Sequence, residues 1–151
     1  LLAGAMGARA IDAAATWADG VVGFSFGPDV AEVAQYFQRV REAWQRAGRS
    51  TAPRLIVGFW YALGDGGRDQ LARHLRRHLN WLDAAAIEQL LPTTGFAGSQ
   101  TELLQLLCAL AAVGADEVIL TPTTLDESDI SQLTAVSEAF RSIHRQTAKG
   151  V

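Results

Sequence analysis

The sequence predicts an α/β protein built around a parallel sheet, and three observations support this class. The first twenty residues already contain a short apolar run, a turn bracketed by glycines, an alanine-rich helical stretch and the start of a second apolar run. Apolar runs and amphipathic stretches then alternate along the chain. One run, residues 55–63, is almost wholly apolar or aromatic, as strands buried on both faces of a parallel sheet are.

The first cycle of this pattern runs from strand to strand without a linker. Residues 1–3 form the first expected strand, and residues 4–7, with a glycine at each end, form a tight turn. An alanine-rich helix is expected over residues 8–18, where an aspartate and a glycine stop it, and the second strand is expected over residues 21–26. A connection of this kind, from strand through helix to strand, is typical of parallel pairing.

The second cycle begins with a long amphipathic helix that reaches about residue 47. Gly48 follows it, in the position where a left-handed residue commonly closes a helix. The third strand is expected over residues 55–63, and a basic helix over residues 68–82 follows it. The long apolar run of this strand indicates that it is buried on both faces.

The last part of the chain repeats the pattern. Ser99 and Glu102 make the S-x-x-E capping box of a leucine-rich helix that ends at Gly114. The elements expected here are a short helix at residues 84–91, a loop at 91–98, this leucine-rich helix, a fourth strand at 117–121 and a last helix from Asp126 onward. The sequence therefore predicts four strands that alternate with at least four principal helices.

Length and composition fit one domain over residues 1–151. The chain is 49% hydrophobic and 19% charged, which is enough apolar material for a buried core. A formal net charge of −3 argues against nucleic acid as a partner, because the phosphate backbone favours a basic face. The longest apolar stretch, residues 103–113, has the length of a buried helix and not that of a membrane span.

The compartment and the extent of the chain give two further expectations. The single cysteine, Cys108, excludes an internal disulfide framework, and no secretory signal is visible, so the cytoplasm is the expected compartment. The sequence starts at Leu1, inside an expected strand and without an initiator methionine. A natural domain rarely begins in this way, so we expect the chain to be the later part of a longer protein.

Four parallel strands with intervening helices fit either a small doubly wound sheet or half of a (β/α)8 barrel. The first turn, G-A-M-G, is too short for the G-x-G-x-x-G fingerprint that a doubly wound sheet usually carries there. The helix-to-strand joints at residues 18–20 and 114–117 are short and alike, as they are in a barrel. These joints favour the barrel but leave both architectures open.

Four segments together resemble one known family: LAGAMGARAIDAAATWADGVV at the start, REAWQRAGRS before the third strand, RLIVGFWYALG in that strand, and GADEVILTPTTLD near the end. In this order and spacing the chain resembles the second half of the luciferase-like, flavin- or deazaflavin-dependent oxidoreductases. The resemblance implies a (β/α)8 TIM barrel in which this chain supplies strands five to eight with their helices, while the half with strands one to four is absent. It also implies FMN, or alternatively the deazaflavin coenzyme F420, with hydride transfer or oxygen insertion on a small-molecule substrate.

The missing half leaves two hypotheses for function. A complete barrel needs roughly 250 residues, and the resemblance implies that much of the substrate-side chemistry lies in the absent half. The first hypothesis is the flavin-dependent enzyme, whose activity needs more than this chain. The alternative is a non-catalytic half-barrel that binds a partner, such as its own copy, through strand edges left bare at Leu1 and Glu117. We expect a homo-oligomer.

The resemblance places the cofactor at the turn after the first strand. Ligands of TIM barrels lie at the carboxyl ends of the strands, and backbone N–H groups can approach a phosphate closely where glycines lack a Cβ atom. The expected cofactor-binding residues are Gly4, Ala5, Met6, Gly7 and, after the second strand, Ser25. The alternatives are that the glycines only make a tight connection and that Ser25 only shapes a turn.

Several conspicuous residues are assigned structural roles. Asp19, Asp116 and Glu117 precede strands, at the end of a barrel that mostly holds the fold together. His74 and His78 stand four residues apart on a helix, but the arginines around them would repel a cation, so we expect no metal site. His78 falls within an apolar arc of this helix, which predicts a half-buried histidine.

The remaining candidates lie near the barrel mouth and in the third strand. Thr123 and Thr124 offer hydroxyls either to a ligand or to the cap of the last helix. No pair of nucleophile and base is visible, so no catalytic residue is named, which suits an enzyme whose cofactor carries the chemistry. Alternation sends Phe59 and Tyr61 to one side of the sheet and Trp60 to the other. We expect one side to fill the barrel interior and the other to pack under helices.

Overall fold

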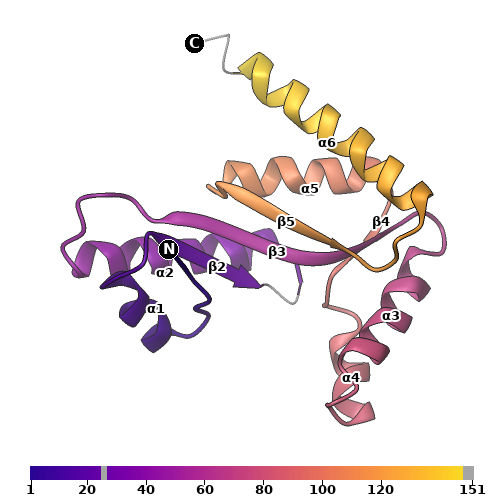
Figure 1. Ribbon diagram of the computed structural model, residues 1–151, viewed down its shortest axis with the longest axis horizontal. Coiled ribbons are helices and arrows are strands. Elements are labelled where there is room, and N and C mark those ends of the chain that lie inside the picture. Colours follow the sequence, from indigo (N-terminus) through magenta and orange to yellow (C-terminus); the bar gives the residue numbers. More distant parts are fainter. Residues whose placement is uncertain (25–26, 148–151) are drawn as a thin grey trace.

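The computed structural model describes residues 1–24 and 27–147, which form an α/β fold with one parallel sheet (Figure 1). The elements within these residues are, in chain order, β1 (Leu2–Ala3), α1 (Ala8–Ala15), β2 (Gly20–Phe24), α2 (Val30–Arg46), β3 (Arg54–Leu63), α3 (Gly67–His78), α4 (Ala84–Leu90), β4 (Phe96–Gly98), α5 (Gln100–Ala112), β5 (Glu117–Pro122) and α6 (Glu127–Thr147). None of the helices in these two ranges combines the length and the apolar character that a membrane crossing needs.

β3 is the central strand of the sheet, and all strand pairs in the described part of the chain are parallel. β2 pairs with residues 54–58 of β3 and carries β1 on its other side. β5 pairs with residues 56–61 along the opposite edge of β3. The prediction of four parallel strands that are adjacent in chain order is therefore confirmed for β1, β2, β3 and β5.

A fifth strand, β4, occupies part of the segment 91–98, so the expectation of a loop there is wrong. β4 pairs with residues 61–63 of β3, beyond the last residue that β2 covers. Because β3 is ten residues long and extends past β2, the backbone groups at its carboxyl end need another partner. Gly95, with a φ of +73°, turns the chain into this pairing.

Several element boundaries differ from those that the sequence predicts, most clearly in α1, α3 and β2. α1 ends early, at Ala15, because the next two N–H groups bond three residues back instead of four. α3 ends early, at His78, since the chain must leave the helix to place Asp83 as the N-cap of α4. β2 begins at Gly20, and the last two residues expected in it, 25 and 26, lie outside the described residues.

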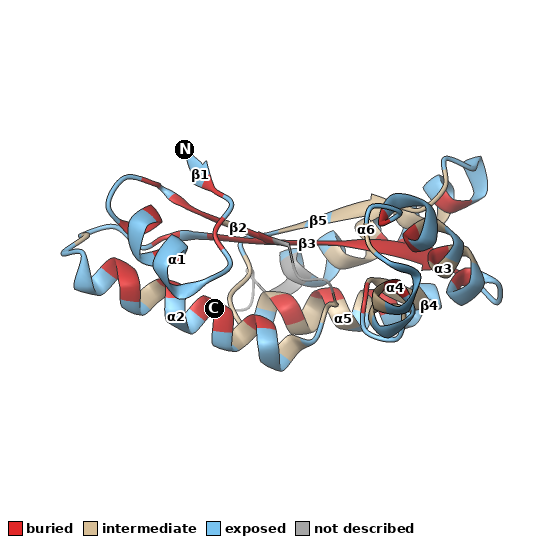
Figure 2. Cartoon of the chain, turned by 90° about the horizontal axis from the view of Figure 1, so that it is seen from below, coloured by how far each residue is buried: buried red, intermediate tan, exposed pale blue. Residues whose placement is uncertain are grey.

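Alternation along β3 divides the core into two clusters, and Figure 2 shows β3 buried along nearly its whole length. Phe59 and Tyr61 belong to the larger cluster, together with residues of α1, α2 and α5. Trp60 and Ala62 belong to the smaller cluster, together with Leu71 and other residues of α3 and α4. The predicted alternation is confirmed: the Phe59 and Tyr61 side packs under α1, α2 and α5, and the Trp60 side packs against α3 and α4.

Trp60 also explains the positions of the two histidines of α3. Its ring centroid lies 5.6 Å from that of His74 and 4.9 Å from that of His78. The two imidazole rings stack on each other with an interplanar angle of 11°. His74 is half-buried and His78 is exposed, so the prediction of a half-buried His78 is wrong. The helical periodicity located the apolar arc but not the tryptophan against which the histidines pack.

This packing makes the stability of the fold depend on pH. Burial and, secondly, the neighbouring His78 hold the pKa of His74 below its ordinary value of 6.5. The folded chain therefore binds fewer protons here than the unfolded chain, so the contribution of His74 to stability is fully present above pH 6.5 and declines below it. Between about pH 7.5 and about pH 5, the melting temperature of the wild-type chain should fall more than that of His74→Gln. Thermal melts followed by circular dichroism measure this, and parallel pH profiles for the two chains would contradict it.

Candidate functional site

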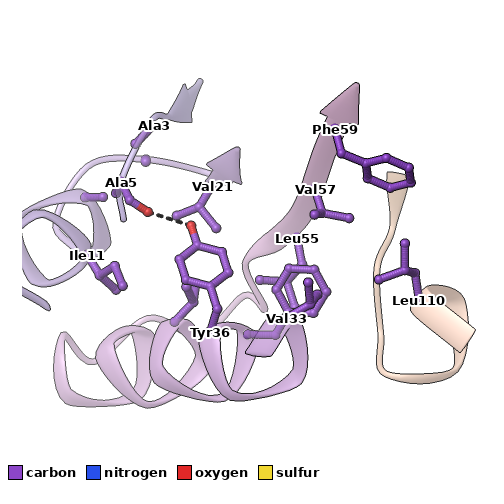
Figure 3. Packing of buried hydrophobic residues seen from close by; sticks show 14 of the residues in the cluster. Ala3, Ala5, Ile11, Val21, Val33, Tyr36, Leu55, Val57, Phe59 and Leu110 are labelled. Atoms are coloured by element: carbon purple, nitrogen blue, oxygen red, sulfur yellow. Dashed lines mark hydrogen bonds between the residues drawn. The ribbon is translucent and has the colours of Figure 1, made fainter. Parts of the chain in front are cut away.

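The turn between β1 and α1 lies at the carboxyl end of the first strand and is exposed everywhere except at Ala5. Ala5 packs into the larger core cluster. Its carbonyl oxygen accepts a hydrogen bond of 2.6 Å from the hydroxyl of Tyr36 in α2 (Figure 3). The turn is therefore fixed to α2 at one residue, while Gly4, Met6 and Gly7 on either side remain exposed.

Tyr36 reaches this turn because β2 carries a glycine beside it. A Cβ atom at position 23 would lie 2.7 Å from the Tyr36 ring, so only Gly23 leaves room for the tyrosine. Burial raises the pKa of Tyr36 to about 12, which keeps the hydroxyl a hydrogen-bond donor at neutral pH. The sequence analysis missed Tyr36. Glycine inside an apolar strand often marks the close approach of another group, and Gly23 was the available signal.

The two glycines of the turn leave open space around them. No atom lies within 4 Å of the place where a Cβ atom at Gly4 or Gly7 would stand. Gly7 has φ −85° and ψ 156°, an extended conformation that any residue can adopt. The backbone conformation therefore does not require glycine at position 7, and what the glycine provides is access to the backbone.

The amino end of α1 differs from those of its neighbours. Asp29, Asp83 and Ser99 each cap a helix (α2, α4 and α5) by accepting a hydrogen bond from a backbone N–H of the first turn. α1 has no such side-chain cap and no acidic residue in its first turn, where Arg9 is exposed. Uncapped N–H groups and the positive end of the helix dipole favour an anion at this position.

A cleft of about 640 Å³ opens beside this turn. Its walls come from the turn itself, β2, the start of α2, β3 and the segment after α4, and the lining residues are Met6, Gly23, Gly27, Pro28, Asp29, Glu32, Val33, Tyr36, Arg39, Val57, Pro92, Thr93 and Gly95. The carboxylate of Asp29 accepts from the N–H of Glu32 and places negative charge at the amino end of α2. Of these two helices, α1 is therefore the one suited to hold an anion.

The acidic residues that precede strands all make structural contacts. Asp116 accepts a hydrogen bond of 2.7 Å from the backbone N–H of Leu55 at the start of β3. Glu117 pairs with Arg54 at 2.6 Å, and Asp19 pairs with the amino terminus of the chain. The structural roles that the sequence predicts for the three acids agree with these contacts. No three histidine, cysteine, aspartate or glutamate side chains gather as a metal site within the described ranges.

The two threonines after β5 support the fold at the carboxyl end of the sheet. Thr123 donates its hydroxyl to the carbonyl oxygen of Tyr61, and Thr124 donates to the carboxylate of Asp129 in the first turn of α6. Of the two predicted roles, this geometry favours the structural one. Ser25, the remaining predicted site residue, lies outside the described residues.

The sequence matches no protein-family model and no curated protein. Two solved structures resemble the fold. One is an F420-dependent secondary alcohol dehydrogenase in complex with an F420-acetone adduct, with a TM-score of 0.61 and 15% identity over 83% of this chain and 44% of that chain. The other is a long-chain alkane monooxygenase, with a TM-score of 0.64 and 14% identity over 97% of this chain and 41% of that chain. This chain thus spans about two-fifths of their length. Its parallel sheet and helices have the fold of half of a TIM barrel.

Proposed function

We propose that this chain holds the phosphate-bearing tail of a flavin at the turn between β1 and α1, as part of a luciferase-like oxidoreductase. FMN is the first candidate and coenzyme F420 the alternative. The observation that carries the proposal is the amino end of α1, which is exposed, uncapped and preceded by two glycines with open space around them. A helix end of this kind binds anions through its N–H groups and its dipole, and ligands of TIM barrels bind at this end of the strands.

The residues of this chain would bind and orient the cofactor. The backbone N–H groups of Met6, Gly7 and Ala8 are the proposed phosphate donors, and Arg9 adds a positive charge in the same turn of helix. Tyr36 fixes the turn through the carbonyl oxygen of Ala5. A bound flavin or deazaflavin would itself supply the chemistry of hydride transfer or oxygen insertion.

The fold match supports an oxidoreductase reaction. The cofactor, the substrate and the compartment are part of the proposal. One of the two similar solved structures is described as a complex with an F420-acetone adduct, which supports F420 as the alternative cofactor. The substrate is proposed to be a small molecule. The proposed compartment is the cytoplasm, on the ground that the chain has a single cysteine.

Replacing Gly7 with valine tests the phosphate site. The extended backbone at Gly7 accepts valine without strain, so the fold should remain while the side chain occupies the open space at the turn. We expect FMN affinity to fall by about 1–3 kcal/mol, or roughly 5–150-fold, as charge-assisted hydrogen bonds are lost. Riboflavin, which has no phosphate, should bind both proteins equally. Titrations monitored by flavin fluorescence measure the four affinities.

Gly66→Val is the matched control for this experiment. Gly66 is the N-cap residue of α3, where it also lacks a side-chain cap and has open space around it. This variant should leave both affinities unchanged, and the same comparison can be made with F420. A wild-type chain that binds FMN and riboflavin equally, or a Gly7→Val chain with unchanged FMN affinity, would reduce the turn to a connection between β1 and α1.

A further inference from the structure

The wall that α2 gives to the cleft carries one acidic and one basic side chain. Glu32, Tyr36 and Arg39 all line the cleft, and their spacing of four and three residues puts them on one face of the helix. Glu32 and Arg39 are seven residues apart, so their Cα atoms are separated by about 10 Å along the helix axis. Ion pairs within one helix join residues three or four positions apart, so these two charges are too far apart to neutralise each other.

Both charged groups lack a polar partner in the described part of the chain. Arg41, Glu42 and Arg46, the other charged residues of α2, each make a hydrogen bond or an ion pair through their side chains. The carboxylate of Glu32 and the guanidinium of Arg39 make neither with any described residue, and both side chains are exposed at the cleft. The two charges of α2 that face the cleft are therefore the two that remain available to a ligand.

The lining between these charges is apolar. Val33 and the ring of Tyr36 lie on α2 and face β3, which carries Val57 (Figure 3). Met6, which is 51% exposed, adds a thioether from the turn between β1 and α1. A ligand with an apolar middle can bury its chain against these four residues.

The two ends of the cleft differ in the sign of their charge. Asp29 lines the cleft near Glu32 and adds a second carboxylate, which caps α2 by accepting from a backbone N–H. Arg39 lies close enough to Tyr36 for its positive charge to oppose the rise that burial causes in the pKa of this tyrosine. The hydroxyl of Tyr36 is bonded to the turn between β1 and α1, so the positive end of the cleft lies on the side of this turn.

We propose that the cleft binds a zwitterion, a small molecule with a protonated amine and a carboxylate joined by an apolar chain of about 10 Å. The amine contacts Glu32, the carboxylate contacts Arg39, and the chain lies across Val33 and Val57. The volume of about 640 Å³ falls within the range of small-molecule sites, roughly 300–1,000 Å³. A single exposed ion pair binds weakly, whereas joining both charges in one molecule makes the second contact intramolecular.

This inference goes beyond the proposed cofactor site and does not depend on it. The proposed phosphate donors are backbone N–H groups at the amino end of α1, whereas the zwitterion contacts side chains of α2. Binding of the zwitterion is measured without flavin, and the flavin titrations are made without the zwitterion. Either proposal can therefore fail while the other stands.

Four compounds test whether both charges and their separation matter. ω-Aminooctanoate has both charges at the required distance, octanoate lacks the amine, octylamine lacks the carboxylate, and ω-aminobutanoate has both charges too close together. Isothermal titration calorimetry of the chain at neutral pH and low salt measures the affinities. We expect ω-aminooctanoate to bind roughly 5-fold more tightly than each of the other three, the effect of one additional exposed ion pair.

Two variants identify the side chain that meets each charge. Glu32→Gln should weaken the binding of ω-aminooctanoate roughly 5-fold and leave that of octanoate unchanged, because octanoate has no amine. Arg39→Gln should weaken ω-aminooctanoate equally and leave octylamine unchanged. Both residues are exposed, so the circular dichroism spectra should not change.

Glu42→Gln and Arg46→Gln are the matched controls. Both residues are exposed charges of the same helix that do not line the cleft, so these variants should keep the wild-type affinities. The proposal is overturned if the wild-type chain binds octanoate or octylamine as tightly as ω-aminooctanoate, or binds none of the four compounds. It is also overturned if folded Glu32→Gln and Arg39→Gln chains keep the wild-type affinity for ω-aminooctanoate.

Discussion

Replacing Trp60 with alanine is expected to lower the free energy of unfolding by about 3–5 kcal/mol, the usual cost of removing a buried tryptophan. Trp60 is 8% exposed, and its side chain lies on the face of β3 that packs against α3. Its ring also supports the stacked imidazoles of His74 and His78. Alanine would leave a cavity between the strand and the helix, and α3 cannot close it without losing the contacts of Leu71 and Leu75.

Urea unfolding followed by circular dichroism measures this loss, with Trp81→Ala as the matched control. Trp81 lies between α3 and α4 and is 74% exposed, so its replacement should change the free energy of unfolding by less than about 0.5 kcal/mol. Equal midpoints for the two variants would show that Trp60 does not pack under α3.

Replacing Asp129 with alanine is expected to cost about 3 kcal/mol, because two hydrogen bonds to a charged group are lost at a buried position. Asp129 is 8% exposed. Its Oδ2 atom accepts from the side-chain amide of Gln70 at 3.0 Å and from the hydroxyl of Thr124 at 2.9 Å. The same amide of Gln70 donates to Thr123. The network connects α3, the end of β5 and the first turn of α6.

Two further variants test whether the loss of stability comes from the hydrogen bonds of Asp129, from its charge or from its place in the first turn of α6. Asp129→Asn keeps an acceptor oxygen and should lose less stability than alanine does. Glu127→Ala removes an exposed acid from the same turn of α6 and should have little effect. If Asp129→Ala melts at the same temperature as Glu127→Ala, the network contributes nothing measurable to the fold.

The parts of the fold that the sequence predicts correctly depend on local chemistry. The capping box of Ser99 and Glu102 is present, and Gly48 follows α2 with a left-handed φ of +69°. The alternation of Phe59, Trp60 and Tyr61 assigns each ring to the correct side of β3. Each of these signals lies within a few neighbouring residues, where backbone sterics and hydrogen bonding decide the outcome.

The features that the sequence did not reveal depend on contacts between distant residues. The bond from Tyr36 to Ala5 spans 31 residues, and the bond from Gln70 to Asp129 spans 59. β4 forms because β3 extends past β2, a length difference that appears only once the strands are paired in register. For the candidate site, the glycines marked the turn, but the anchoring tyrosine lies 31 residues away, and only Gly23 signalled that some group approaches β2 closely.

Both core clusters take side chains from β3, but only the smaller one includes α3 and α4. This difference predicts which part of the fold unfolds first. The larger cluster contains no residue of α3 or α4, whereas the smaller one takes Trp60 and Ala62 from β3. If α3 and α4 detach, the larger cluster keeps its own contacts, but if β3 leaves the sheet, both clusters lose their common strand. We therefore expect the segment of residues 67–91 to open as a separate cooperative unit of lower stability, with amide protons that exchange with solvent through partial openings while the rest of the sheet stays protected.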